Sequence, residues 1–273
     1  MPEFLQYDFM IRALVSGLIV GVICPVIGIF IVLKRLSMIG DCLSHAAMAG
    51  VAAGMLTGVY PVYGALAFMI AAGLTVERLR NEYRQYSELA IAVILSSSIS
   101  LAIILLSVGK SYNTSVFAYL FGSILTVSGQ DLKAITGLGL LVILVVWLLR
   151  KELFYIAFDE EAAHLAGIPV AMINIVFILL TAFTIAASLR IVGILLVSSL
   201  MVIPVAASLQ LKQGFRRTVW LAIGLSVTSV VIGLIAAFYL DWAPGGTVVM
   251  TAVLGLLAII MVQRIKRRRR PVT

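Results

Sequence analysis

An aspartate and a histidine inside an apolar stretch are the residues with the clearest chemical potential. Asp41 and His45 lie in the segment 38–57, which otherwise holds mostly apolar and small residues. Their four-residue spacing places both side chains on one face of a helix, about one turn apart. A carboxylate oxygen and an imidazole nitrogen suit a first-row divalent cation, zinc especially. Because two ligands do not complete a tetrahedral site, we expect a homodimer whose second copy supplies the other two.

A purely structural role for this pair is the alternative. Asp41 follows Gly40, so it could cap the amino end of the helix, and its carboxylate could hold His45 through a hydrogen bond. Cys42 could be a soft ligand, but on a helix it points about 100° away from Asp41. A small buried side chain that fills space is the simpler interpretation of Cys42.

One flank of the same helix consists of small residues. Columns of small residues four positions apart let helix backbones approach closely, where lipid provides no hydrophobic drive. We therefore expect close helix packing beside an ion path, formed by Ala46, Gly50 and Gly54.

The composition is that of a polytopic membrane protein. Of the 273 residues, 62% are hydrophobic and 12% are charged, whereas soluble domains have about 45–50% and about 25%. This excludes a disordered chain, and two cysteines inside apolar runs do not make a disulfide scaffold. We expect one all-α domain over residues 1–273, with nine spanning helices, or eight because several candidates are short or interrupted. The candidate spans are residues 9–33, 38–57, 60–76, 87–107, 130–149, 170–189, 191–209, 218–240 and 245–263.

Lysine and arginine predict the orientation. With the carboxyl end in the cytoplasm, 16 of the 20 basic residues lie in cytoplasmic loops or the tail, as the positive-inside rule requires. The protein is therefore expected in the cell membrane, with several passes and a basic cytoplasmic tail at 264–273. Such a tail next to a span meets anionic lipid, and we expect no nucleic-acid partner. On the outer side, the loop 108–129 contains an apolar piece, 116–127, that predicts a short or half-inserted helix.

The cytoplasmic loop 150–169 is the second informative stretch. Residues 159–166 read as a short helix, with Asp159 as its cap, an acidic first turn, and a stop at residues 167–169. An exposed interfacial helix is the simpler interpretation, and a docking site for a soluble partner is the functional one. His164 on this helix reads as a solvated or interface residue. The loop carries four carboxylates: Glu152, Asp159, Glu160 and Glu161.

The sequence has no motif for supplying energy itself. It lacks the G-x-x-x-x-G-K-[ST] phosphate-binding loop and the H-E-x-x-H zinc-protease motif. A membrane protein with an ion site and a docking helix but no ATP site is therefore expected to work with a partner that hydrolyses ATP.

Three stretches, in order, resemble blocks of the ABC-type zinc/manganese uptake permeases. They are KRLSMIGDCLSHAAMAGVAAG from Lys34, DEEAAHLAGIP from Asp159, and RIVGILLVSSLMVIPVAAS from Arg190. In that family an Asp-x-x-x-His pair begins the helix within the first block and is followed by small residues. The second resembles the coupling helix, which carries the importer pattern EAA-x-x-x-G, here Glu161, Ala162, Ala163 and Gly167.

The resemblance implies a homodimeric permease, two cytoplasmic ATP-binding subunits and an extracytoplasmic receptor that delivers the metal. Asp41 and His45 would be pathway ligands. No cofactor would be bound permanently; Zn²⁺ would be the transported substrate, with Mn²⁺ as the alternative. The ATPase contact would be formed by residues 159–169, including Asp159, Glu160, Glu161, Ala162, Ala163 and Gly167.

Two other classes of protein remain open. An ion-coupled secondary transporter would also use intramembrane Asp and His, although it would usually show inverted repeats, which the sequence does not display. A membrane enzyme or scaffold is the third possibility. Uptake that depends on ATP and on a partner ATPase separates the first interpretation from both.

Overall fold

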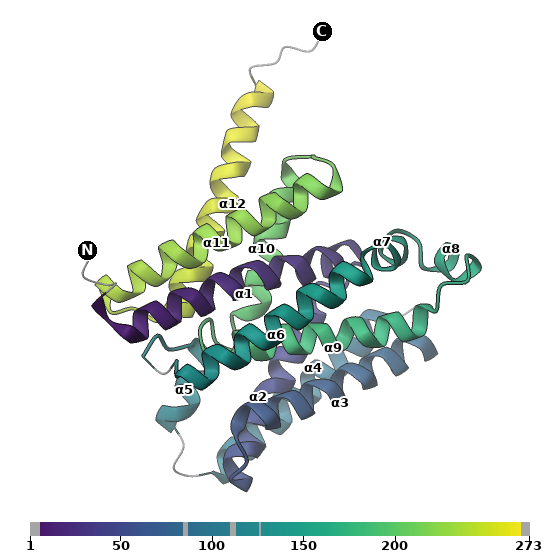
Figure 1. The fold of residues 1–273 in the computed structure, drawn as a ribbon. Helices are drawn as coiled ribbons and strands as arrows, with labels where there is room; N and C mark the ends of the chain where they lie inside the picture. The colour runs from purple at the N-terminus through teal and green to yellow at the C-terminus, as the bar shows by residue number, and fades with distance from the viewer. Residues whose placement is uncertain (1–5, 84–86, 110–112, 126, 269–273) are drawn as a thin grey trace.

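The computed structural model describes residues 6–83, 87–109, 113–125 and 127–268, and its regular structure is helical (Figure 1). This confirms the all-α class. The helices are α1 (Asp8–Leu33), α2 (Ile39–Thr57), α3 (Pro61–Glu82), α4 (Ser87–Val108), α5 (Asn113–Phe121), α6 (Gly129–Leu148), α7 (Arg150–Phe158), α8 (Glu160–Leu165), α9 (Val170–Ser188), α10 (Val197–Gln210), α11 (Phe215–Leu240) and α12 (Pro244–Arg268).

Eight helices in the described ranges are long and apolar enough to cross a membrane. They are α1, α2, α3, α4, α6, α9, α11 and α12, so the smaller of the two expected counts is correct. The prediction of a continuous spanning helix at 191–209 is wrong, because α10 has only 14 residues. Of the expected basic tail, residues 264–268 continue α12, and 269–273 lie outside the described residues.

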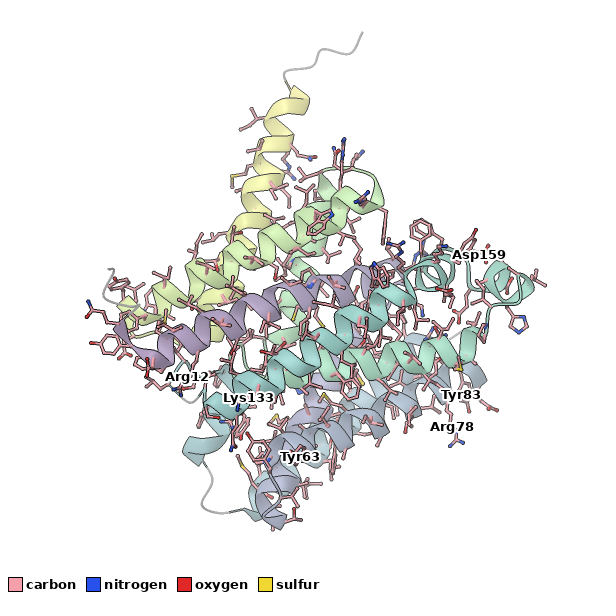
Figure 2. All side chains as sticks on the ribbon, in the orientation of Figure 1. Arg12, Tyr63, Arg78, Tyr83, Lys133 and Asp159 are labelled. Carbon is pink, nitrogen blue, oxygen red and sulfur yellow. The ribbon has the colours of Figure 1, made fainter. Side chains whose placement is uncertain are left out.

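The two ends of the bundle differ in the residues they carry. Figure 2 shows Arg78, Tyr83 and Asp159 toward one end, which we call the α8 end. Arg12, Tyr63 and Lys133 lie toward the opposite end. The division agrees with the loop assignment made from the basic residues.

The chain nevertheless crosses the bundle between α9 and α11. Arg190, just after α9, bonds to Tyr60 at the end opposite α8. Phe215, which begins α11, lies at the α8 end. The centre of its ring is 6.0 Å from the ring centre of Phe30 and 4.9 Å from that of Phe154. Residues 191–196 and the short helix α10 therefore make a ninth crossing, which is not helical throughout.

A non-helical crossing survives in lipid only where its backbone is buried in protein and hydrogen-bonded. The backbone nitrogens of Ile194 and Leu195 donate to the carbonyls of Tyr119 and Leu120, at 2.9 and 3.2 Å. These carbonyls belong to the last turn of α5, which has no helical donors for them. The helix expected over 116–127 is therefore present as α5 but covers residues 113–121, and it accepts the hydrogen bonds of the non-helical part of this crossing.

Two glycines make this close approach possible. Gly193 has φ +86°, and a Cβ there would lie 2.4 Å from the carbonyl oxygen of Leu120. Gly122 has φ +76°, and its Cβ would lie 2.2 Å from the oxygen of Ile191. Only glycine accepts both the left-handed conformation and so near a backbone neighbour.

Candidate metal pathway and coupling helix

Asp41 lies in the first turn of α2, half-buried, beside the amino end of α10. The hydroxyl of Ser198, in the first turn of α10, donates a hydrogen bond to Oδ1 of Asp41. Gly40 makes room for this contact, since a Cβ at residue 40 would lie only 3.2 Å from Cβ of Ser198. Helix α10 therefore orients the carboxylate of Asp41 through Ser198.

His45 is half-buried one turn along α2, and its ring nitrogen Nδ1 is buried without a hydrogen-bond partner among the described residues. A buried polar atom without a partner costs free energy, and such atoms are often functional. A purely structural role for the pair would need Asp41 to cap α2 and to hydrogen-bond to His45, and neither contact is seen in the described chain. Asp41 bonds to Ser198 rather than His45, and the amino end of α2 has no side-chain cap.

One copy of the chain offers only part of a metal site. The described residues contain no group of three or more His, Cys, Asp or Glu side chains placed to hold a metal ion. Cys42 has no exposed surface and lies in the apolar core, in keeping with a space-filling role. An ion held by Asp41 and His45 would need further ligands from outside this chain.

The small-residue flank of α2 packs against α3. A Cβ on Gly50 would lie 2.3 Å from the carbonyl oxygen of Gly64, and one on Gly64 would lie 2.3 Å from that of Gly50. Gly54 faces Pro61, whose Cα would lie 3.1 Å from a Cβ at residue 54. Ala46 is buried on the same helix. Gly50, Gly54 and Gly64 let the two backbones approach closely.

The predicted short helix in the 150–169 loop is present as α8. Oδ1 of Asp159 accepts a 2.9 Å hydrogen bond from the backbone nitrogen of Ala162, which caps the helix. Gly167 ends it with φ +79°. Ala163 is buried underneath, whereas Asp159, Glu160, Glu161, Ala162 and Gly167 are exposed. Leu165 is 87% exposed, the largest exposed fraction among the large hydrophobic side chains of the described residues.

Asn174, buried near the start of α9, connects α8 to the spanning helices. Its amide nitrogen donates to Glu160 on α8 at 2.8 Å and to Glu77 on α3 at 3.1 Å. Its amide oxygen accepts from Lys34, which follows α1. Glu77 also pairs with Arg80 at 2.9 Å. Burial lowers the pKa of Lys34 to about 8, with an opposing contribution from Glu160.

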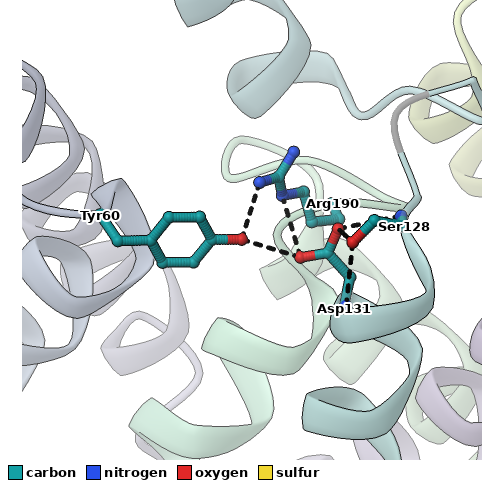
Figure 3. Close-up of polar contacts among 4 residues, drawn as sticks. All are labelled: Tyr60, Ser128, Asp131 and Arg190. Carbon is teal, nitrogen blue, oxygen red and sulfur yellow. Dashed lines mark hydrogen bonds and ion pairs between the residues drawn. The ribbon is translucent and has the colours of Figure 1, made fainter.

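A second polar cluster fastens the opposite end of the bundle (Figure 3). The hydroxyl of Tyr60, before α3, donates to Oδ1 of Asp131 on α6 at 2.9 Å and accepts from Arg190 at 2.9 Å. Nε of Arg190 lies 3.6 Å from the same carboxylate oxygen. Ser128 and Asp131 form a capping box at the start of α6. Burial, ahead of the bond to Asp131, raises the pKa of Tyr60.

Sequence reasoning missed Ser198 and the Asn174 cluster. Ser198 lies in the third block quoted above, and Glu77 and Asn174 are polar residues at the ends of apolar stretches. These signals mark the residues as unusual without naming their partners.

Replacing Ser198 with Ala is expected to reduce metal uptake about tenfold, because second-layer partners of metal ligands commonly contribute 10–100-fold. Uptake per folded protein in whole cells measures the effect. Ser199→Ala is the matched control, since no hydrogen bond joins its side chain to Asp41. Equal uptake by the two variants would contradict an orienting role for Ser198.

Comparison with known proteins supports one family over almost the whole length. The model of the ABC 3 transport family matches residues 6–263. A "Probable metal transport system membrane protein" of Treponema pallidum is 37% identical over 265 residues, which cover 97% of this chain and 99% of the relative. The manganese import system permease protein ScaB of Streptococcus gordonii is 30% identical, with 98% of each chain covered.

A solved structure agrees in three dimensions. PsaBC from Streptococcus pneumoniae, in complex with Fab, superimposes with a TM-score of 0.84 at 29% sequence identity, covering 94% of each chain. The family match, the relatives and this structure agree on one assignment: the chain belongs to the ABC 3 transport family and is the membrane-spanning permease subunit of an ABC transporter.

Proposed function

We propose that two copies of this chain form the membrane part of an ATP-driven importer, which passes a divalent transition-metal ion between paired Asp41 and His45 residues. The observation that carries the proposal is the buried Nδ1 of His45, which no described residue pairs with and which lies one turn from a half-buried carboxylate. A charge within a span costs at least about 2.5–3.5 kcal/mol on insertion scales, so it usually serves a function. Two copies would supply two oxygens and two nitrogens.

We propose Mn²⁺ as the physiological cargo, in place of the Zn²⁺ that the sequence alone favoured. The relative ScaB is described as a manganese import permease, and the Treponema pallidum protein as transporting an unspecified metal. A carboxylate and an imidazole can bind both ions, and the intrinsic affinity of such a site is higher for Zn²⁺ than for Mn²⁺. Affinity does not settle which ion is transported, because selectivity also depends on geometry and on metal availability. In manganese coordination, carboxylate and other oxygen ligands are preferred.

The energy would enter at the α8 end, which we place in the cytoplasm together with the carboxyl terminus. An ATP-binding subunit would hold α8 through Leu165, and two such subunits would serve the dimer. Movement of α8 would reach α9, α3 and α1 through Asn174 and its bonds to Glu160, Glu77 and Lys34. Because residues 34–38 join α1 directly to α2, the same movement would displace Asp41 and His45.

The opposite end would receive the ion from an extracytoplasmic metal-binding receptor. The cluster of Tyr60, Asp131 and Arg190 fastens the helix ends there. The mechanism would then be alternating access, in which the site opens first outward and then inward. An ion site must bind weakly enough to release its ion, which suits ligands divided between two chains.

Metal competition in cells tests the proposal. Cells that lack other importers and express the chain with its ATPase and receptor should accumulate manganese, measured by elemental analysis. A tenfold excess of zinc should reduce this accumulation without an equal gain in cell zinc. Accumulation that continues with an ATPase unable to hydrolyse ATP would indicate the ion-coupled secondary transporter instead. Preferential accumulation of zinc would overturn the choice of Mn²⁺ as cargo but not the proposal of an ATP-driven importer.

A further inference from the structure

A groove outside the metal pathway lies between α1, α6 and α11, three helices that run side by side in Figure 1. Its volume is about 510 Å³, within the range of about 300–1,000 Å³ typical of ligand sites. Ile29 and Phe30 of α1 are buried at its base. Trp147 of α6 and Trp220 of α11 line it as well and are 60% and 65% exposed. The other apolar lining residues are Val26, Ile143, Val146, Phe215, Val219 and Ile223.

Two arginines line the same groove at the α8 end. Arg150 begins α7 directly after α6, and Arg216 lies in the first turn of α11. The Arg150 guanidinium lies 5.7 Å from the centre of the Trp147 ring. Within the described residues, neither arginine forms an ion pair with a carboxylate. The groove thus combines an apolar lining with two cations, neither of which has an anionic partner in the part of the chain that the structure describes.

We propose that this groove binds an anionic phospholipid of the cytoplasmic leaflet. An acyl chain would lie over Ile29 and Phe30, and the phosphate would lie between Arg150 and Arg216. Basic pockets between spanning helices on the cytoplasmic side recognise anionic headgroups, and exposed tryptophans concentrate at the level of the headgroups. The positive charge at the rim selects the anionic class, and the apolar lining selects a ligand with a hydrocarbon tail.

The groove lies apart from the surfaces already assigned. Helix α2, which carries Asp41 and His45, packs against α3, α4, α5, α9 and α10, whereas the groove is bounded by α1, α6 and α11. The exposed Leu165 lies on α8, which is not among the groove's lining elements. A lipid can therefore occupy the groove without blocking the metal pathway or α8.

Native mass spectrometry of the full chain in detergent, titrated with phosphatidylglycerol or phosphatidylcholine, tests the proposal. We expect phosphatidylglycerol to bind at least tenfold more tightly, since each cation near the headgroup contributes severalfold. The double variant Arg150→Gln/Arg216→Gln should lose that preference while still binding phosphatidylcholine. The control Lys151→Gln/Arg217→Gln removes the same charge from neighbouring positions outside the groove lining and should retain the preference.

A filling variant tests the acyl-chain part separately. Val219 lines the groove, so Val219→Phe should weaken binding of both lipids severalfold. If both charge variants lost the preference for phosphatidylglycerol equally, the attraction would be non-specific and the proposed lipid site would be wrong. Unchanged lipid binding, with dissociation of the dimer in Arg150→Gln/Arg216→Gln, would show that a second copy of the chain covers the groove.

Discussion

Asp41→Asn and His45→Ala are each expected to abolish metal uptake while leaving the protein folded and assembled. In the proposed site, which two copies would share, each substitution removes two ligands, since both copies carry it. Loss of a mere second-layer partner already costs 10–100-fold, so uptake should fall by more than about 100-fold. Asn keeps the size of Asp and can still accept the hydrogen bond from Ser198, so the contact between α2 and α10 persists.

The measurement is manganese uptake in cells lacking other importers, normalised to the amount of protein in the membrane. Size-exclusion chromatography with light scattering reports the dimer, and co-purification reports the ATPase. Ser44→Ala is the matched control on the same turn of α2, because its hydroxyl is buried without a partner among the described residues and its removal is nearly neutral. Near-normal uptake by both Asp41→Asn and His45→Ala would defeat the proposed site.

Local sequence patterns predicted the parts of the site that lie within single helices. The four-residue spacing of Asp41 and His45 determines their shared face. The cap at Asp159 and the positive φ of Gly167 delimit α8, so the signals and the helix lie within one short segment. The apolar stretches of eight spans are local properties as well, and the predictions located all eight, although 60–76 and 245–263 end before α3 and α12 do.

Contacts between distant segments could not be predicted in the same way. Ser198 is 157 residues from Asp41, and Asn174 is 140 residues from Lys34. Hydropathy also failed at residues 191–196, because their apolar side chains are equally compatible with a helix. The backbone there follows a different course because α5, far away in the chain, accepts its hydrogen bonds. A single glycine at position 193 was the only local sign of this break.

Leu165→Glu is expected to remove the ATPase from the complex. Leu165 is 87% exposed on α8, so the substitution leaves the interior of the permease intact. In the proposed contact with the ATPase, however, it would forfeit the burial of a leucine, worth about 1.5–3 kcal/mol, and would place a carboxylate in an apolar contact. The affinity of the permease for the ATPase should fall by about tenfold to 100-fold. The control Leu240→Glu makes the same change at the far end of α11, where Leu240 is 51% exposed, and should retain the ATPase.

Asn174→Leu in the same assay separates docking from transmission. The substitution leaves the exposed face of α8 unchanged, so the ATPase should still co-purify and hydrolyse ATP. It removes the amide that joins Glu160 on α8 to Glu77 on α3 and to Lys34 after α1. Helix α8 could then move without carrying α1 and α2 with it, and uptake should fall at least tenfold at unchanged ATP hydrolysis. Loss of ATPase binding would mean that Asn174 supports the docking surface itself, whereas full uptake would mean that the force reaches α2 by another route.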